Sequence, residues 1–121
     1  MIDHITLHVT DIARSKAFYA AALAPLGYAV VMDFGGACGL GVEGKPDFWL
    51  AGGVATQPQM HVAFHAATRA DVDAFYAAAI AAGATDNGGP GLRPQYHPNY
   101  YGAFVLDPDG QNIEAVCHLP E

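Results

Sequence analysis

Residues 4–24 read HITLHVTDIARSKAFYAAALA, and residues 61–81 read HVAFHAATRADVDAFYAAAIA. At this offset of 57 residues, ten of the 21 positions are identical, including both histidines of each stretch. Alanine-rich helices match by chance, but two histidines in register with a shared AFYAAA run are much harder to dismiss. An internal repeat decides the fold assignment before any other signal. We therefore interpret the chain as one half-domain present twice.

The two copies are expected to share one order of elements. Apolar and β-branched residues at 2–9 and 59–66 predict a strand in each copy, and a helix follows each strand. Asp11 and Thr68 are the expected helix N-caps. Three shorter apolar runs follow each helix: 28–34, 37–43 and 47–52 in the first copy, and about 84–87, 100–106 and 111–118 in the second. The order is therefore βαβββ–βαβββ, with the DPDG sequence at 107–110 as the last turn.

The two predicted helices carry the expected core residues. The apolar positions of the second helix fall at helical spacing and form a core-facing stripe: Val72, Phe75, Tyr76, Ala79 and Ile80. Phe18 and Tyr19 of the first helix match Phe75 and Tyr76 in the repeat and are expected in the core as well.

Composition limits the class of protein. At 121 residues and 12.7 kDa, the chain fits a single domain. Its formal charge of −7, with only five Lys and Arg, leaves no basic stripe for nucleic acid. No apolar run is long enough to predict a membrane span. The start of the chain lacks a signal-peptide pattern, and Cys38 and Cys117 do not form a disulfide framework. We expect a cytoplasmic protein that has reduced thiols and binds a small molecule.

The histidines lie on predicted strands in a repeated pattern. His4 and His8 share one face of their strand but are about 13 Å apart, too far to bind one metal ion through bonds of about 2.1 Å. A pseudo-twofold relation instead brings one histidine from each copy together, either His4 with His61 or His8 with His65. The last strand adds Glu114, which is flanked by apolar residues and is costly to bury unless it is paired or bound to a metal. His118 follows Glu114 at the same spacing of four. The pattern favours an inner layer of His4, His61 and Glu114 and an outer layer of His8, His65 and His118.

Three segments together resemble the vicinal oxygen chelate superfamily, which includes glyoxalase I, bleomycin-resistance proteins and extradiol dioxygenases. They are DHITLHVTD at 3–11, MHVAF at 60–64 and DPDGQNIE at 107–114, so the resemblance spans essentially the whole chain. It implies an α+β fold in which two βαβββ modules, about 1–54 and 58–121, form a curved mixed sheet around a central cleft. It also implies a homodimer, because the family commonly pairs modules across two chains.

The resemblance implies a metal site. Metal-dependent members take ligands from the positions of His4, His61 and Glu114, and all three residue types are suitable here. Several members add a fourth ligand on the last strand of the first module, where this chain has Trp49. A three-residue site with open positions is therefore expected, for one divalent ion (Zn, Fe, Mn, Ni or Co). The alternative is a cleft of hydrogen-bonded polar residues without metal.

The segment from Asn87 to Gly102 has no counterpart of equal length in the first copy. Long irregular loops in compact domains are often functional. The candidate catalytic residues are Glu114 and, in or next to this loop, His97 and Tyr101. The candidate substrate-binding residues are His8, His65, Trp49, Arg93 and His118. For the seven candidates other than Glu114, packing, a hydrogen-bonded surface position or a stiff surface loop is the competing interpretation.

Two functions remain open at this point. The first is a divalent-metal-dependent lyase or isomerase that acts on a small vicinally oxygenated substrate, with imidazole moving a proton. The resemblance disfavours glutathione or phosphonate chemistry, because the position where relatives often carry an arginine is His8 here. It also disfavours a ring-cleaving dioxygenase, which usually needs a longer chain. The second function is a metal-free, bleomycin-resistance-type protein that binds a small molecule.

Overall fold

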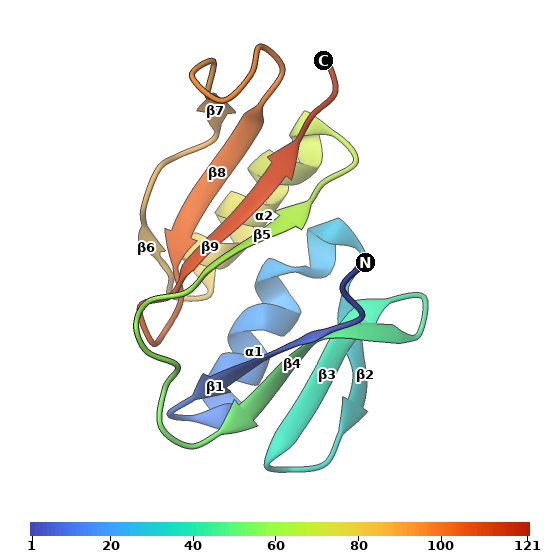
Figure 1. Cartoon of the computed structure of the whole chain (residues 1–121), viewed down its shortest axis with the longest axis vertical. Helices are drawn as coiled ribbons and strands as arrows, with labels where there is room; N and C mark the ends of the chain where they lie inside the picture. Colours follow the sequence, from blue (N-terminus) through green and yellow to red (C-terminus); the bar gives the residue numbers. More distant parts are fainter.

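The computed structural model describes all 121 residues and contains two modules in chain order. The first module contains β1 (Ile5–Val9), α1 (Ile12–Ala22), the short 3₁₀ helix η1 (Ala24–Leu26), β2 (Ala29–Asp33), β3 (Ala37–Val42) and β4 (Lys45–Gly52). The second contains β5 (His61–His65), α2 (Arg69–Ala81), β6 (Thr85–Asp86), β7 (Gly91–Leu92), β8 (Tyr101–Leu106) and β9 (Asn112–Cys117). Figure 1 shows the first module in the lower half of the view and the second above it.

Each module forms a mixed sheet with the same strand order. The first sheet has the strand order β1-β4-β3-β2 and the second has the order β5-β9-β8-β6. Strand β7 pairs with the first two residues of β8. In both sheets the first strand pairs in parallel with the last strand of its module, and the remaining pairs are antiparallel. The two-module α+β fold predicted from the repeat is confirmed.

Local signals set the boundaries of the helices. The Asp11 carboxylate accepts the backbone N–H of Arg14, and the Thr68 hydroxyl accepts that of Asp71, so both predicted N-caps are confirmed. The DPDG turn joins β8 to β9 as predicted and ends at Gly110, whose φ of 85° favours glycine. One strand, β7 inside the long loop, was not predicted. Its two residues are too few to show the alternation of a strand.

The core lies between the sheets and their helices. Tyr19, Phe48 and Phe75 are among its largest fully buried side chains. Tyr76 of the predicted stripe packs only partly buried against this core. Ile80 is 37% exposed, so its assignment to the core was wrong: in the last turn of α2, Ala79 is fully buried and Ile80 lies at the exposed edge of the stripe. No helix in the structure has the length and apolar character needed to cross a membrane.

The modules meet through their helices and through one buried polar contact. Helices α1 and α2 pack against each other, and Phe48 of β4 meets Phe64 of β5 edge to face. The Tyr19 hydroxyl of α1 donates to the buried carboxylate of Asp107, at the end of β8. No strand pairing joins the two sheets, so β1 and β5 are end strands within the chain (Figure 1).

One face of each sheet is left uncovered by the helices. Along β1, Leu7 and Val9 are buried while His8 is exposed; along β5, Phe64 is buried while His61 and His65 are exposed. Because side chains alternate along a strand, the histidines of both modules lie on the faces turned away from the helices. These open faces carry the candidate site residues.

Candidate functional site

A histidine and a carboxylate meet on the open face of the second sheet. His61 Nε2 lies 2.8 Å from Glu114 Oε1, because β5 and β9 pair in parallel and place Glu114 opposite Ala63, two residues beyond His61. The Glu114 side chain is only 1% exposed, whereas that of His61 is 52% exposed. A ligand from solvent therefore meets the exposed imidazole of His61 before the buried carboxylate of Glu114. A carboxylate held this way needs polar partners, since burial of an unpaired charge is costly.

Tyr100 supplies the second partner of Glu114. Its hydroxyl donates to Oε2, the oxygen that does not face His61. Burial and the neighbouring carboxylate raise the pKa of the Tyr100 phenol well above its usual value, so the hydroxyl keeps its proton as a donor. Both carboxylate oxygens of Glu114 are therefore engaged by side chains of the second module.

The end of the long loop packs as an aromatic cluster, which consists of Tyr96, His97, Tyr100 and His118. The Tyr100 ring lies edge-on to the other three at centroid distances of 4.9, 5.4 and 5.3 Å respectively. His97 Nδ1 accepts the backbone N–H of Asn99, so Nε2 of His97 is the protonated nitrogen that donates to His118 Nδ1 at 2.7 Å. The loop is thereby tied to His118, directly after β9, while Tyr100 connects the loop to Glu114.

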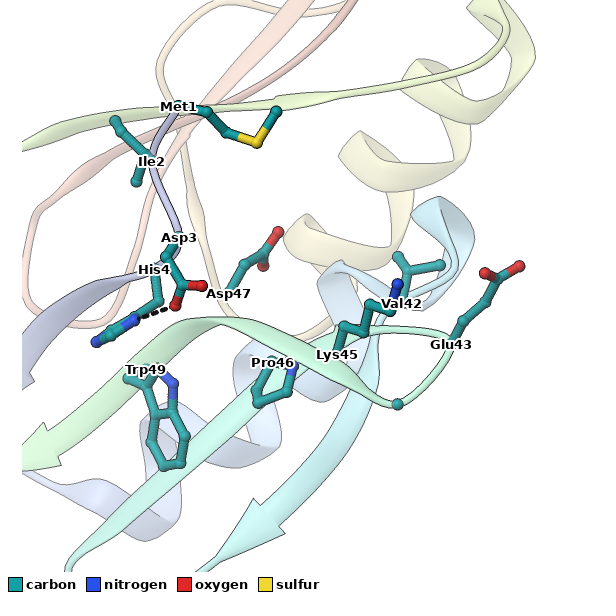
Figure 2. A pocket seen from close by; sticks show the side chains of 11 residues that line it. Met1, Ile2, Asp3, His4, Val42, Glu43, Lys45, Pro46, Asp47 and Trp49 are labelled. Carbon is teal, nitrogen blue, oxygen red and sulfur yellow. Dashed lines mark hydrogen bonds and ion pairs between the residues drawn. The ribbon is translucent and has the colours of Figure 1, made fainter.

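His4 lies apart from this pair within the chain. Its half-exposed ring bonds to the adjacent Asp3 carboxylate at 2.6 Å, and it lines an open cavity of about 810 Å³ together with Trp49. Figure 2 shows the cavity between the N-terminal residues and the β3–β4 hairpin, with the His4 imidazole next to the indole. Nowhere in one chain do three His, Cys, Asp or Glu side chains gather where they could hold a metal ion. The structure thus brings two of the three expected ligands together.

Trp49 occupies the position in the first module that Glu114 occupies in the second. In the parallel ladders, Thr6 pairs with Trp49 and Ala63 pairs with Glu114, and the repeat aligns Thr6 with Ala63. The indole stacks on Phe34 at 6.1 Å, with an angle of 10° between the rings. Trp49 therefore forms an apolar wall beside His4 where a fourth metal ligand would otherwise be placed.

The outer-layer and loop candidates have different surroundings. His8 and His65 are exposed, and no hydrogen bond to their rings is formed. Arg93 donates to the carbonyls of Gly89 and Gly91 and lies 5.3 Å over the Phe104 ring, on the open face. The Phe104 ring is in turn 6.1 Å from that of His61.

Tyr101 points away from the site, in contrast to the expectation for a catalytic residue. Its hydroxyl donates to Asp73 of α2 at 2.7 Å, on the helix side of the sheet. Tyr100, its neighbour, is the tyrosine that reaches Glu114. The signal that could have identified it is strand alternation: in β8, Gly102 and Phe104 share the open face, and Tyr100 extends that series by two residues.

Comparisons with known proteins identify the family. The sequence model of one family, described as "Glyoxalase/Bleomycin resistance protein/Dioxygenase superfamily", matches residues 1–115. A glyoxalase/bleomycin resistance protein from Albidiferax ferrireducens T118 is 31% identical, with 94% of this chain and 96% of that chain covered and a TM-score of 0.80. The chain belongs to this superfamily. No curated protein matches it.

More distant members of the superfamily share the fold. An enzyme of the family from Burkholderia phytofirmans PsJN is 21% identical, covers 98% of both chains and has a TM-score of 0.76. The E126Q mutant of the fosfomycin resistance protein FosX from Listeria monocytogenes, solved with Mn(II) and 1S,2S-dihydroxypropylphosphonic acid, is 20% identical and has a TM-score of 0.74. It covers 100% of this chain and 92% of its own. Some superfamily members of this fold therefore bind a divalent metal.

The His61–Glu114 pair fits such an ion. Two donor atoms bound to one ion at about 2.1 Å are about 3.0 Å apart at a right angle and about 3.4 Å apart at a tetrahedral angle. The 2.8 Å between Nε2 and Oε1 is slightly shorter than either spacing, so the two groups would separate by only a few tenths of an ångström to admit an ion. One imidazole and one carboxylate are also a donor set that suits Zn, Mn, Fe, Ni and Co.

Proposed function

We propose that this glyoxalase-superfamily protein is a homodimer with one divalent metal ion in each site. His61 and Glu114 of one chain and His4 of a second copy would hold the ion, which leaves positions open for a substrate. The proposed reaction is a lyase or isomerase reaction on a small molecule with vicinal oxygens. When bound, the ion supplies Lewis-acid stabilisation of negative charge that develops on these oxygens.

The observation that carries this proposal is the buried carboxylate of Glu114 next to an exposed imidazole. Glu114 makes no contact with a basic Lys or Arg side chain that would neutralise it, and its oxygens face only His61 and Tyr100. A carboxylate placed behind an accessible histidine is a costly arrangement for packing alone. A divalent ion that binds both groups would offset this cost.

The dimer is proposed because the third donor is displayed but not used within the chain. His4 lies half-exposed on an open face, next to a cavity. Strand β1, which begins directly after His4, and strand β5, which begins at His61, are both end strands. End strands and open faces are the features through which sheets associate with another chain. Facing the first module of one copy towards the second module of another would complete the three-ligand set.

The residues around the pair have proposed roles that follow from their contacts. The His97–His118 pair lies at the rim, and the remaining Nε2 of His118 is available to exchange a proton with substrate. Trp49 and Phe34 would form an apolar wall for the substrate, and Arg93 over Phe104 is the nearby cation for an anionic substituent. His8 and His65 would line the outer part of the cleft.

Elemental analysis of the purified protein tests the metal site. We expect about one divalent ion per chain in the wild type, and loss of the ion in both Glu114→Gln and His4→Ala. Asp73→Asn is the matched control, because this carboxylate bonds a tyrosine on the helix side and its substitution should leave the metal content unchanged. If the wild type holds no metal after reconstitution with Zn, Mn, Fe, Ni and Co, the metal-free binding protein becomes the better assignment.

A subunit-mixing experiment tests the shared site. His4→Ala and Glu114→Gln chains are unfolded together and refolded, so that some dimers contain one chain of each kind. If the site is shared, each mixed dimer regains one intact set of ligands and binds one ion. If all three ligands come from one chain, the mixture binds no more metal than the separate variants.

A further inference from the structure

We propose that Tyr100 is a positioning residue that restricts Glu114 to a one-oxygen contact with the metal ion, and that Gly102 supplies the space this arrangement needs. The inference rests on the proposed metal site and assigns roles to two residues outside the ligand set.

The two oxygens of Glu114 have different partners. Oε1 lies 2.8 Å from His61 Nε2, whereas Oε2 accepts the Tyr100 hydroxyl. An ion between His61 and Oε1 would leave the Tyr100 bond untouched, whereas an ion bound to both oxygens would have to share Oε2 with the Tyr100 hydroxyl. A phenol hydroxyl donates a hydrogen bond, so the contact with Tyr100 keeps Oε2 engaged. Tyr100 thus selects which oxygen of Glu114 is free to act as a ligand.

Tyr100 is itself held on all sides. Its backbone N–H donates to the carbonyl of His97 at 3.2 Å, and its carbonyl accepts the N–H of Arg93 at 2.8 Å. Its ring packs edge-on against three other aromatic rings of the cluster. The hydroxyl therefore has a fixed location relative to β9. A hydroxyl held in this way can orient the Glu114 carboxylate instead of moving with it. This gives the long loop a function: it delivers one hydroxyl to Glu114.

Gly102 lies where any side chain would press on this contact. A Cβ at Gly102 would be 3.2 Å from Glu114 Oε2 and 3.2 Å from Cε1 of the Tyr100 ring. Both distances are shorter than ordinary van der Waals contact, so one neighbour would have to move. Its φ is not in the left-handed region, unlike that of Gly110, so backbone conformation does not require a glycine. A glycine is required here because the Tyr100–Glu114 contact needs the space that a side chain would fill.

The neighbouring tyrosine is a matched control within the same strand region. Tyr101 also donates its hydroxyl to a carboxylate, that of Asp73, but on the opposite side of the sheet. Removal of either hydroxyl deletes one tyrosine–carboxylate hydrogen bond. Only the Tyr100 bond ends on the proposed ligand.

The affinity of the 121-residue protein for Mn²⁺ and Zn²⁺ tests the inference. We expect Tyr100→Phe to lower the affinity for both metals by about 10–100-fold, the range typical for loss of a hydrogen bond to a ligating group. Tyr101→Phe should leave the affinity unchanged. Metal binding to the wild type and to Tyr101→Phe should also perturb the near-ultraviolet absorption of tyrosine, and Tyr100→Phe should lose this signal.

Gly102→Ala is the second variant, since it keeps both the hydroxyl and the carboxylate but forces them apart. It should weaken metal binding in the same direction, while Gly36→Ala, whose Cβ would meet nothing within 4 Å, should not. If the wild type binds metal and both Tyr100→Phe and Gly102→Ala bind it equally well, the roles assigned to these residues are refuted although the metal site stands. If the wild type binds neither metal, the metal site itself is refuted, and this inference with it. If Tyr100→Phe does not fold, the Gly102→Ala result decides.

Discussion

Replacement of Tyr19 by Phe tests how the two modules are held together. Tyr19 is fully buried in α1 of the first module, and its hydroxyl donates to Oδ2 of Asp107 in the second. Oδ1 of Asp107 accepts the backbone N–H groups of Asp109 and Gln111, both at 2.9 Å. Oδ2 has no other partner, so the substitution leaves a buried carboxylate oxygen without a hydrogen bond.

The expected loss follows from that unsatisfied oxygen. Leaving a buried polar atom unpaired costs about 1–3 kcal/mol of the free energy of unfolding. For a chain of 121 residues the entropy of unfolding is about 0.25 kcal/mol/K, so each kcal/mol lowers the melting temperature by about 4 °C. We therefore expect Tyr19→Phe to melt about 4–12 °C below the wild type at neutral pH.

The size of the loss should depend on pH. Burial raises the pKa of Asp107, and the bond from Tyr19 opposes that rise. A carboxyl whose folded pKa is raised stabilises the fold most below its ordinary pKa, and this contribution is lost as the pH rises through the folded value. Removing the Tyr19 hydroxyl raises the folded pKa further, so the charged Asp107 becomes costlier. The deficit of Tyr19→Phe should be largest at neutral pH and shrink as the solution is acidified.

Thermal unfolding of both proteins at one matched concentration, across a pH series, measures this difference. Tyr28→Phe is the control, because its hydroxyl bonds Asp47 at 3.0 Å near the surface and within one module. Its expected loss is below about 1 kcal/mol, since water replaces the missing partner. Equal losses in the two variants, or a Tyr19→Phe deficit that does not change with pH, would refute the reasoning.

Three further predictions concern other parts of the chain. Gly39→Ala would place a Cβ 2.8 Å from the ring of Trp49, the single tryptophan, so it should shift the intrinsic fluorescence, whereas Gly36→Ala should not. Thr68→Ala removes the N-cap of α2 and should lower the free energy of unfolding by about 1 kcal/mol in a denaturant titration. Both cysteines are buried and free, and burial raises the pKa of the Cys38 thiol, so a thiol reagent should label neither until denaturant is added.

The repeat made the fold predictable because it reports on backbone pattern, which is set locally. Caps at Asp11 and Thr68 and the DPDG turn depend on neighbouring residues alone, and all three are confirmed. Exposure of Ile80 was not predictable in this way, since helical spacing gives the face of a residue but not how far the partner module extends over it. The burial of a helix end is set by tertiary packing.

The candidate site was predictable to the extent that strand pairing determines it. The spacing of His61 and Glu114 along β5 and β9 follows from alternation and parallel register, and the structure brings them together. Tyr101 was the tyrosine predicted for the site, but its hydroxyl lies on the helix side and Tyr100 reaches Glu114, because one residue of register reverses the face of a side chain. A loop without a repeat partner offered no second copy against which to fix that register.

The duplicated frame also explains why the proposed site is asymmetric. The repeat supplies two equivalent histidines, His4 and His61, each next to a last strand that could carry a carboxylate. Only the second module has one, Glu114, and only the second module has a long loop whose tyrosine orients it. The first module has Trp49 at that position and leaves His4 with Asp3 alone. A metal ion would therefore be held mainly by the second module, while the first contributes one imidazole and an aromatic wall. This division assigns metal affinity to residues around Glu114 and substrate selection to residues around Trp49, so substitutions in the two modules should separate the two properties.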